Sequence, residues 1–227
     1  MIEMYTGFVG SGKSYHATHE ALIIAESRTD KEVIANFPIK KKVKKLHSKI
    51  NKMLKRNYPV YKDIRWTYWD NDELSPLKLI EKSFAYKAKH GDLPPEGHYL
   101  LIIDEAGIVF NSRDWNVKPD ERKNWIKFFT QSRKLGYDII LIVQDNRMLD
   151  RQIRSLVEYE VQHKKMNNWT LFKFLPVTMF LSVKFWNGVR GIRGNMSITR
   201  YKKSVADRYD TQSLFGYGDE LKIEDII

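Results

Sequence analysis

The chain contains no cysteine among its 227 residues. That absence excludes disulfide-stapled folds, thiolate metal sites and cysteine nucleophiles, and it is consistent with a reducing compartment. Long apolar runs are also missing. The most apolar window, residues 175–183, is interrupted by Pro176 and is shorter than the roughly twenty residues that a membrane-spanning helix needs. The start of the sequence lacks the charged and apolar blocks of a signal peptide.

Acidic residues are absent from one stretch, between Lys40 and Lys62, although the whole chain contains 28 of them. The formal net charge is +11, and nine basic residues of this stretch supply most of it: Lys40, Lys41, Lys42, Lys44, Lys45, Lys49, Lys52, Lys55 and Arg56. A chain of this length suits one substantial core with additions. The basic stretch is therefore expected to be an insertion into that core.

Residues 7–14 read Gly-Phe-Val-Gly-Ser-Gly-Lys-Ser and match the phosphate-loop pattern G-x-x-x-x-G-K-[ST] in full. In that pattern backbone N–H groups surround a phosphate, the lysine reaches the β- and γ-phosphates, and the last hydroxyl binds Mg²⁺. Residues 2–6 are expected to form the strand entering the loop and residues 15–25 the helix leaving it. The expected ligands are ATP and Mg²⁺, and the expected nucleotide-binding residues are Gly7, Val9, Gly10, Ser11, Gly12, Lys13, Ser14 and Tyr15.

A second strand is expected over residues 99–103, where a continuous apolar run ends in Asp104 and Glu105. Such a run is typical of a strand buried on both faces of a parallel sheet. Asp104 is expected to hold the magnesium ion together with Ser14, as a Walker B aspartate does. Glu105 is expected to polarise the attacking water.

A third apolar strand, residues 138–143, ends at Gln144. In the additional-strand (ASCE) class of phosphate-loop ATPases, this strand lies between the two strands described above, and its terminal polar residue faces the γ-phosphate. Gln144 is expected to be that sensor. A glutamine that merely caps a turn at the strand end is the alternative.

The helix expected over residues 119–135 has Asp120 and Glu121 at its positive end and ends before Gly136. Arg133 lies in its last turn, where the helix dipole favours a cation. An arginine finger reaching a neighbouring subunit's nucleotide is the other interpretation of Arg133, and both remain open. Weaker candidates for that role are Arg113, Arg147 and Arg151.

Together these segments resemble the zonular occludens toxin (Zot) family, which includes the gene I assembly proteins of filamentous phages. The resemblance is carried by the phosphate loop, residues 101–106, residues 131–145, and short patches at 148–154 and 209–211. It implies an ATPase of the RecA-like FtsK/HerA branch that acts as a ring, often a hexamer. In such rings the finger comes from the helix before the sensor strand, which favours Arg133.

The resemblance also implies a function and a location. Family members power assembly and extrusion of filamentous virions at the host inner membrane, which implies viral single-stranded DNA, coat proteins and inner-membrane assembly proteins as partners. The cytoplasmic face of that membrane is the expected location. Family members usually carry a transmembrane helix after the ATPase domain, and none is visible in this sequence. Nothing in it supports the toxin label.

The basic stretch is expected to form a helix with one narrow apolar stripe. A solvated surface helix, a contact with anionic membrane and a contact with single-stranded DNA all remain open. Nearby aromatic residues either stack on bases or lie on the buried side of a strand. The residues expected to make the DNA or membrane contact are Lys41, Lys44, Lys45, Lys49, Lys52 and Arg56.

The expected fold is a three-layer α/β phosphate-loop NTPase with a mostly parallel sheet. Residues 1–165 are expected to form the ATPase domain, with the basic helical insertion at about 39–57. Residues 166–227 are expected to form a β-rich extension packed on that domain, with strands at 172–186 and 194–201 and an Asn-Gly turn between them. A small-molecule kinase and a nucleotide-gated scaffold are the rival functions.

Overall fold

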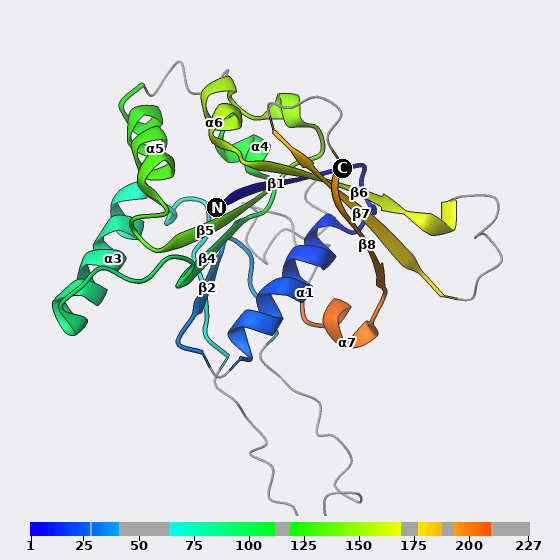
Figure 1. Ribbon diagram of the computed structural model, residues 1–227, viewed down its shortest axis with the longest axis horizontal. Helices are drawn as coiled ribbons and strands as arrows, with labels where there is room; N and C mark the ends of the chain where they lie inside the picture. Colours follow the sequence, from blue (N-terminus) through cyan, green and yellow to red (C-terminus); the bar gives the residue numbers. More distant parts are fainter. Residues whose placement is uncertain (28, 41–63, 112–118, 169–176, 188–192, 210–227) are drawn as a thin grey trace, which may run out of the picture.

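An eight-stranded sheet with the order β3-β2-β4-β5-β1-β6-β7-β8 forms the centre of the molecule. The computed structural model describes residues 1–27, 29–40, 64–111, 119–168, 177–187 and 193–209 (Figure 1). Neighbouring strands from β3 to β6 are parallel, and β7 and β8 are antiparallel additions at one edge. The strands are β1 (Ile2–Thr6), β2 (Glu32–Ala35), β3 (Trp66–Tyr68), β4 (Tyr99–Ile103), β5 (Tyr137–Ile142), β6 (Tyr159–Lys165), β7 (Met179–Trp186) and β8 (Arg193–Arg200).

Helices cover both faces of the sheet, so the expected three-layer α/β fold is confirmed (Figure 1). Leu101 and Leu141 pack with Phe128 on one face, whereas Ile102 and Ala21 share the core on the other. The first face carries α3 (Pro76–His90), α4 (Ala106–Val109), α5 (Pro119–Gln131) and α6 (Arg151–Leu156), and the second carries α1 (Lys13–Ala25) and α7 (Lys203–Ala206). Two short 3₁₀ helices are η2 (Asn146–Met148) and η3 (Met166–Asn168).

Strand β4 is apolar throughout because helices cover it on both sides. Its side chains alternate between the two cores: Leu101 and Ile103 face the α5 side, and Leu100 and Ile102 face the α1 side. All five residues of the strand are buried. The polar pair Asp104 and Glu105 begins where this double burial stops, at the carboxyl end of the sheet.

The helix expected over residues 119–135 is shorter in the structure and ends at Gln131. Ser132 leaves the helix because its N–H and its hydroxyl both bond to the carbonyl of Phe129, at 3.3 and 2.8 Å. The chain then turns through residues 132–136 into β5, with Gly136 at φ 83°. Arg133 therefore lies in this turn and not in the last turn of a helix.

The β7–β8 hairpin extends the main sheet, with pairs such as Val183 and Met196 in register. Strand β7 starts at Met179, where the expected strand began at 172; residues 169–176 and 188–192 lie outside the described part. The Asn167 side chain bonds to Val177 O and Met179 N and fixes the start of β7. The Asn-Gly turn of the expected hairpin lies partly outside the described residues.

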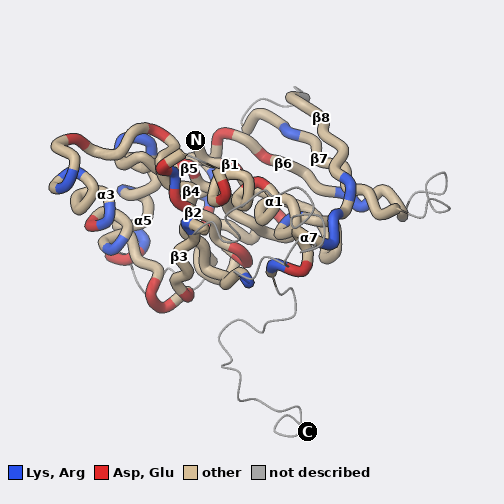
Figure 2. Tube along the Cα trace, turned by 90° about the horizontal axis from the view of Figure 1, so that it is seen from below, with Lys and Arg blue, Asp and Glu red and all other residues tan. Residues whose placement is uncertain are grey.

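The basic stretch expected to be a helix, at about residues 39–57, lies almost wholly outside the described residues. In the described part, Lys and Arg are spread over separate elements, among them α3, α5 and the β7–β8 hairpin, with Asp and Glu between them (Figure 2). None of the helices in the described part is both long and apolar enough to cross a membrane.

Candidate nucleotide site

The phosphate loop connects β1 to α1 at the carboxyl end of the parallel strands. Gly7 has φ 141° and Gly12 has φ 94°. A Cβ on Gly7 would lie 2.4 Å from the carbonyl oxygen of His163, and a Cβ on Gly12 would lie 2.6 Å from the Phe180 ring. Both positions therefore require glycine, because the backbone is left-handed and a neighbour leaves no room for a side chain.

Two features of the loop suit an anionic ligand. The Ser11 hydroxyl is buried and has no hydrogen-bond partner within the described part of the chain. A buried polar group of this kind normally has a partner, so Ser11 is matched to a group that the protein itself does not supply. A Cβ on Gly10 would meet nothing within 4 Å, and Val9 is 82% exposed. The loop is thus open at its tip.

The Lys13 side chain is held across the loop by backbone carbonyls at the start of the loop. Its Nζ donates to the carbonyl oxygen of Gly7 at 2.9 Å and to that of Phe8 at 3.2 Å. Burial lowers the pKa of Lys13, and the carboxylates of Asp104 and Glu105 oppose that effect. One ammonium and two carboxylates therefore share a single site.

Ser14 and Asp104, the two expected magnesium ligands, contact each other. The Ser14 hydroxyl bonds to the Asp104 carboxylate, and Asp104 Oδ1 also accepts the N–H of Glu105 at 2.9 Å. Burial raises the pKa of Asp104, whereas these two hydrogen bonds and Lys13 lower it. A hydroxyl oxygen beside a carboxylate is a donor set that suits Mg²⁺, which prefers oxygen ligands. The residues present therefore fit the expected magnesium ion.

Glu105 has a strained backbone. Its φ of 49° makes it the one residue other than glycine with positive φ among the described residues. Such strain costs about 1–3 kcal/mol and tends to occur at functional sites. Burial, followed by the neighbouring Asp104, raises the pKa of Glu105, while Lys13 lowers it. A carboxylate with a raised pKa beside the phosphate loop is suited to accepting a proton.

Gln144 follows β5, and β5 lies between β4 and β1 as expected for the additional-strand class. The Gln144 carbonyl accepts a hydrogen bond from the N–H of Gly7 at 3.2 Å. Its side chain is exposed. The sensor candidate is thus tied through its backbone to the first glycine of the phosphate loop.

Asn36 is a site residue that the sequence analysis did not identify. It is 1% exposed, and its side chain holds both backbone groups of Asp104. Its Oδ1 accepts the Asp104 N–H at 2.7 Å, and its Nδ2 donates to the Asp104 carbonyl at 2.9 Å and to Asn71 Oδ1 at 2.8 Å. Its position directly after β2, at the carboxyl edge of the sheet, is the signal that would have identified it.

The segment after β8 returns to the phosphate loop. The Tyr15 hydroxyl donates to the carbonyl of Arg200 at 3.2 Å and accepts the N–H of Lys202 at 2.8 Å. The rings of Tyr15 and Tyr201 stack with centroids 5.5 Å apart. Tyr209, in the second patch that carries the resemblance, has its pKa raised by burial and by Asp104. This segment therefore reaches the same site from the far end of the chain.

A pair of histidines beside the loop, half-buried His16 and buried His163, was not identified by the sequence analysis either. His16 Nδ1 is 3.0 Å from His163 Nε2, and His163 Nδ1 is 3.0 Å from the carbonyl of Val161. Burial, then the neighbouring His16, lowers the pKa of His163 to about 3. A neutral His163 therefore supports the first turn of α1.

Arg133 is not brought to this site. It lies before β5, at the amino end of the strands, and its Nε pairs with Glu96 Oε1 at 2.6 Å. The arginine-finger interpretation of Arg133 stays a prediction about a neighbouring subunit. Six further expected contact residues lie outside the described residues: Lys41, Lys44, Lys45, Lys49, Lys52 and Arg56.

Comparison with known proteins gives both sequence and structural relatives. The Gene 1 protein of Enterobacteria phage fd is 47% identical over 73 residues, which are 32% of this chain and 20% of that protein. The Gene 1 protein of Escherichia phage If1 is 42% identical over the same length and the same shares of both chains. The aligned stretch therefore spans about a fifth of these relatives.

Solved structures share the fold. The N-terminal domain of zonular occludens toxin from Neisseria meningitidis is 20% identical, with a TM-score of 0.51, and the match covers 92% of this chain and 98% of that one. A second solved structure, an ATPase domain, is 10% identical, with a TM-score of 0.56, and the match covers 92% and 84%. The model of the family "Zonular occludens toxin (Zot)" matches residues 1–213, and the chain therefore belongs to the Zot family.

Proposed function

We propose that this chain hydrolyses ATP with Mg²⁺ and uses the energy to assemble and extrude a filamentous phage at the host inner membrane, moving viral single-stranded DNA or the virion. The observation that carries the proposal is the convergence of Lys13, Ser14, Asp104 and Glu105 at the carboxyl ends of β1 and β4. The Gene 1 proteins of filamentous phages, which share up to 47% identity over 73 residues, support the biological setting.

Each residue has a role that its surroundings suit. Lys13 leaves the carbonyls of Gly7 and Phe8 and binds the β- and γ-phosphates, while the loop N–H groups bind the phosphate oxygens. Ser14 and Asp104 hold the magnesium ion, which when bound neutralises charge on the β- and γ-phosphate oxygens. Glu105 orients the attacking water and takes its proton. Gln144 contacts the γ-phosphate. When that phosphate leaves, a shift of Gln144 is transmitted to the loop through the hydrogen bond between its carbonyl and the N–H of Gly7.

The proposal includes a homo-oligomeric ring, a hexamer, in which Arg133 of one subunit reaches the nucleotide of the next. The exposed position of Arg133, whose side chain is 73% exposed, supports a role outside its own subunit. Coat proteins and inner-membrane assembly proteins complete the proposed partners. The proposed location is the cytoplasmic face of the inner membrane.

Phosphate release tests the proposal directly. Purified chain is assayed with ATP and Mg²⁺, with and without single-stranded DNA and anionic vesicles. We expect turnover that DNA or lipid stimulates and that Lys13→Ala abolishes, because Lys13 is the ligand of the β- and γ-phosphates. Turnover that Lys13→Ala leaves intact would refute the site.

The same preparation distinguishes the rival functions. A motor sediments as a ring when an ATP analogue is present, whereas a small-molecule kinase stays monomeric and transfers phosphate only to an added acceptor. A nucleotide-gated scaffold binds ATP and shows negligible phosphate release under every condition. Sedimentation and phosphate release together therefore separate the three.

A further inference from the structure

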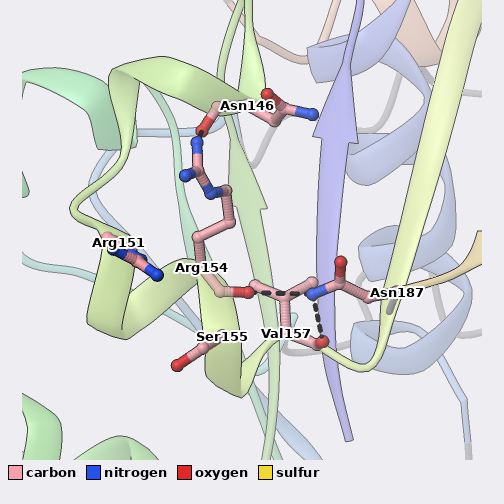
Figure 3. Close-up of a pocket in the computed structure, with 6 residues that line it drawn as sticks. All are labelled: Asn146, Arg151, Arg154, Ser155, Val157 and Asn187. Carbon is pink, nitrogen blue, oxygen red and sulfur yellow. Dashed lines mark hydrogen bonds between the residues drawn. The ribbon is translucent and has the colours of Figure 1, made fainter. Parts of the chain in front are cut away.

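A pocket lies beside the segment that follows Gln144, on the opposite side of β1 from α1 (Figure 3). It has a volume of about 440 Å³ and is open to solvent. Residues of η2, of α6 and of the end of β7 line it: Asn146, Arg151, Arg154, Ser155, Val157 and Asn187. A volume in this range is enough to hold a nucleotide-sized group.

The lining is basic, and its two arginines supply hydrogen-bond donors. Arg151 and Arg154 are three residues apart on α6, and none of the lining residues is acidic. Within the described part of the chain, the exposed Arg151 guanidinium makes neither a hydrogen bond nor an ion pair. Arg154 Nη1 donates to the Asn146 carbonyl at 3.3 Å, and its remaining N–H groups are free of bonds to described residues. Guanidinium groups bind phosphate oxygens in a bidentate manner.

Hydrogen bonds between the elements that line the pocket hold it together. The Asn187 side chain donates to the carbonyl oxygens of Arg154 and Val157 at 2.8 and 2.7 Å, so the end of β7 is fastened to α6. Figure 3 shows this amide beside the backbone of both residues, and the Arg154 side chain reaching from α6 to Asn146. The Asp150 side chain caps α6 by accepting the N–H of Gln152 at 2.8 Å. These hydrogen bonds fix the position of α6, which carries both arginines.

Asn146 joins this pocket to the phosphate loop by two routes. It follows Gln144 by two residues, and the Gln144 carbonyl accepts the N–H of Gly7. Its side chain also donates to Glu160 Oε2 at 3.3 Å, and Glu160 Oε1 accepts the Thr6 hydroxyl at 2.8 Å. Both oxygens of this carboxylate are therefore engaged. A ligand that moves Arg154 would therefore shift Asn146, and through it Gln144 and Thr6, which adjoin the phosphate loop.

We propose that this pocket binds the phosphodiester backbone of single-stranded nucleic acid through Arg151 and Arg154, and that the binding is coupled to the nucleotide site through Asn146. The proposal rests on the proposed function for the identity of the polymer. The pocket is open to solvent and so admits a segment of a longer chain, and guanidinium donors such as those of Arg151 and Arg154 are typical backbone contacts. No aromatic side chain lines the pocket, so the proposed contacts are to phosphates, which carry no sequence information.

The test measures binding of a labelled, mixed-sequence single-stranded oligonucleotide by fluorescence anisotropy, without ATP. Arg151→Glu is expected to weaken binding about tenfold or more, because one charge-assisted bond is lost and repulsion is added. The slope of log K against the logarithm of the salt concentration is expected to become shallower by about 0.7, because one phosphate contact is lost. Arg151→Lys keeps the charge and is expected to restore most of the affinity.

The matched control is Arg200→Glu, which makes the same charge change at an exposed arginine on β8. We expect this variant to bind within about twofold of the wild type, because its effect is limited to screened long-range attraction. Equal losses for the two variants, or an unchanged affinity in Arg151→Glu, would overturn the proposal. Full competition by millimolar inorganic phosphate would show a site for free phosphate instead, and would also overturn it.

Coupling is measured with a non-hydrolysed ATP analogue. The oligonucleotide is expected to change the affinity for the analogue, and the analogue to change the affinity for the oligonucleotide by the same factor. Arg151→Glu is expected to abolish both changes while leaving analogue affinity alone unaltered. Because none of these readouts needs hydrolysis, a chain that binds DNA at Arg151 but releases no phosphate refutes only the motor function.

Discussion

At the scale of single residues, the nucleotide site depends on three charged groups held close together. Burial lowers the pKa of Lys13, and the carboxylates of Asp104 and Glu105 oppose that effect. Burial raises the pKa of both carboxylates, but Asp104 also accepts a hydrogen bond from Ser14, whereas Asp104 raises the pKa of Glu105 further. We therefore propose different tasks for these adjacent residues: Asp104 as a metal ligand and Glu105 as a base.

The first prediction concerns Glu105. Glu105→Gln removes the proton acceptor but keeps the shape of the side chain, so ATP is expected to stay bound while turnover falls about 10²- to 10⁴-fold. Retained label from radioactive ATP and steady-state phosphate release measure the two effects. Lys13→Ala is the contrasting variant, because it is expected to lose nucleotide binding as well. Normal turnover in Glu105→Gln would exclude its role as the base.

The second prediction concerns Asn36. Asn36→Ala leaves the Asp104 N–H and carbonyl without their buried partners, so it is expected to lower the free energy of unfolding by about 2–4 kcal/mol. It is also expected to raise the Mg²⁺ concentration needed for hydrolysis, because Asp104 is no longer fixed. Urea unfolding and magnesium titrations measure these. Asn71→Ala, which leaves both bonds to Asp104 intact, is expected to lose only about 1 kcal/mol.

At the scale of elements, α1 is held by the segment that follows β8. Tyr15→Phe removes the hydroxyl that bonds to Arg200 and Lys202, but keeps the ring that stacks on Tyr201. Hydrogen exchange at the Lys202 amide is expected to speed up about fivefold or more, for a lost bond of about 1 kcal/mol. Tyr201→Phe keeps both bonds and is expected to leave this amide protected. Equal exchange in the two variants would contradict the docking.

The contact between β6 and α1 makes the free energy of unfolding depend on pH, because it buries His163. The pKa of His163 is about 3 in the folded chain, and the ordinary value of 6.5 applies in the unfolded chain. Between these values the unfolded chain binds more protons, so the free energy of unfolding falls as the pH falls. His163 is expected to contribute a slope of up to about 1.4 kcal/mol per pH unit in that window. Urea unfolding of His163→Asn is expected to show a shallower slope, and an unchanged slope would contradict the assignment.

At the scale of the whole molecule, the proposed ring makes each site depend on two subunits. Arg133→Ala is expected to lower turnover about 10³-fold or more, although Arg133 lies far from its own phosphate loop. An equal mixture of the Arg133→Ala and Lys13→Ala chains is expected to regain about one quarter of wild-type turnover, because about one interface in four pairs an intact site with an intact finger. A mixture that stays inactive would remove Arg133 from the mechanism.

Much of the site could be read from local sequence. The spacing of residues 7–14, the apolar run ending at Asp104 and the strand ending at Gln144 each predict a ligand contact within a few residues. The end of α5 could not be read in this way. Leu135 looks like a continuation of the helix, but Ser132 bonds back to Phe129 and starts a turn, so Arg133 leaves the helical register.

The sequence by itself determined the phosphate-loop motif and the parallel sheet, because a loop motif and double-sided burial depend on residues adjacent in the chain. Only the tertiary structure decided which residues from distant parts of the chain contact the phosphate loop and the ends of the strands. Asn36 reaches Asp104 across 68 positions because β2 lies next to β4. Arg154 reaches Asn146 because α6 folds back on the loop after β5. Contacts between remote segments depend on strand order and helix docking, which no local pattern encodes.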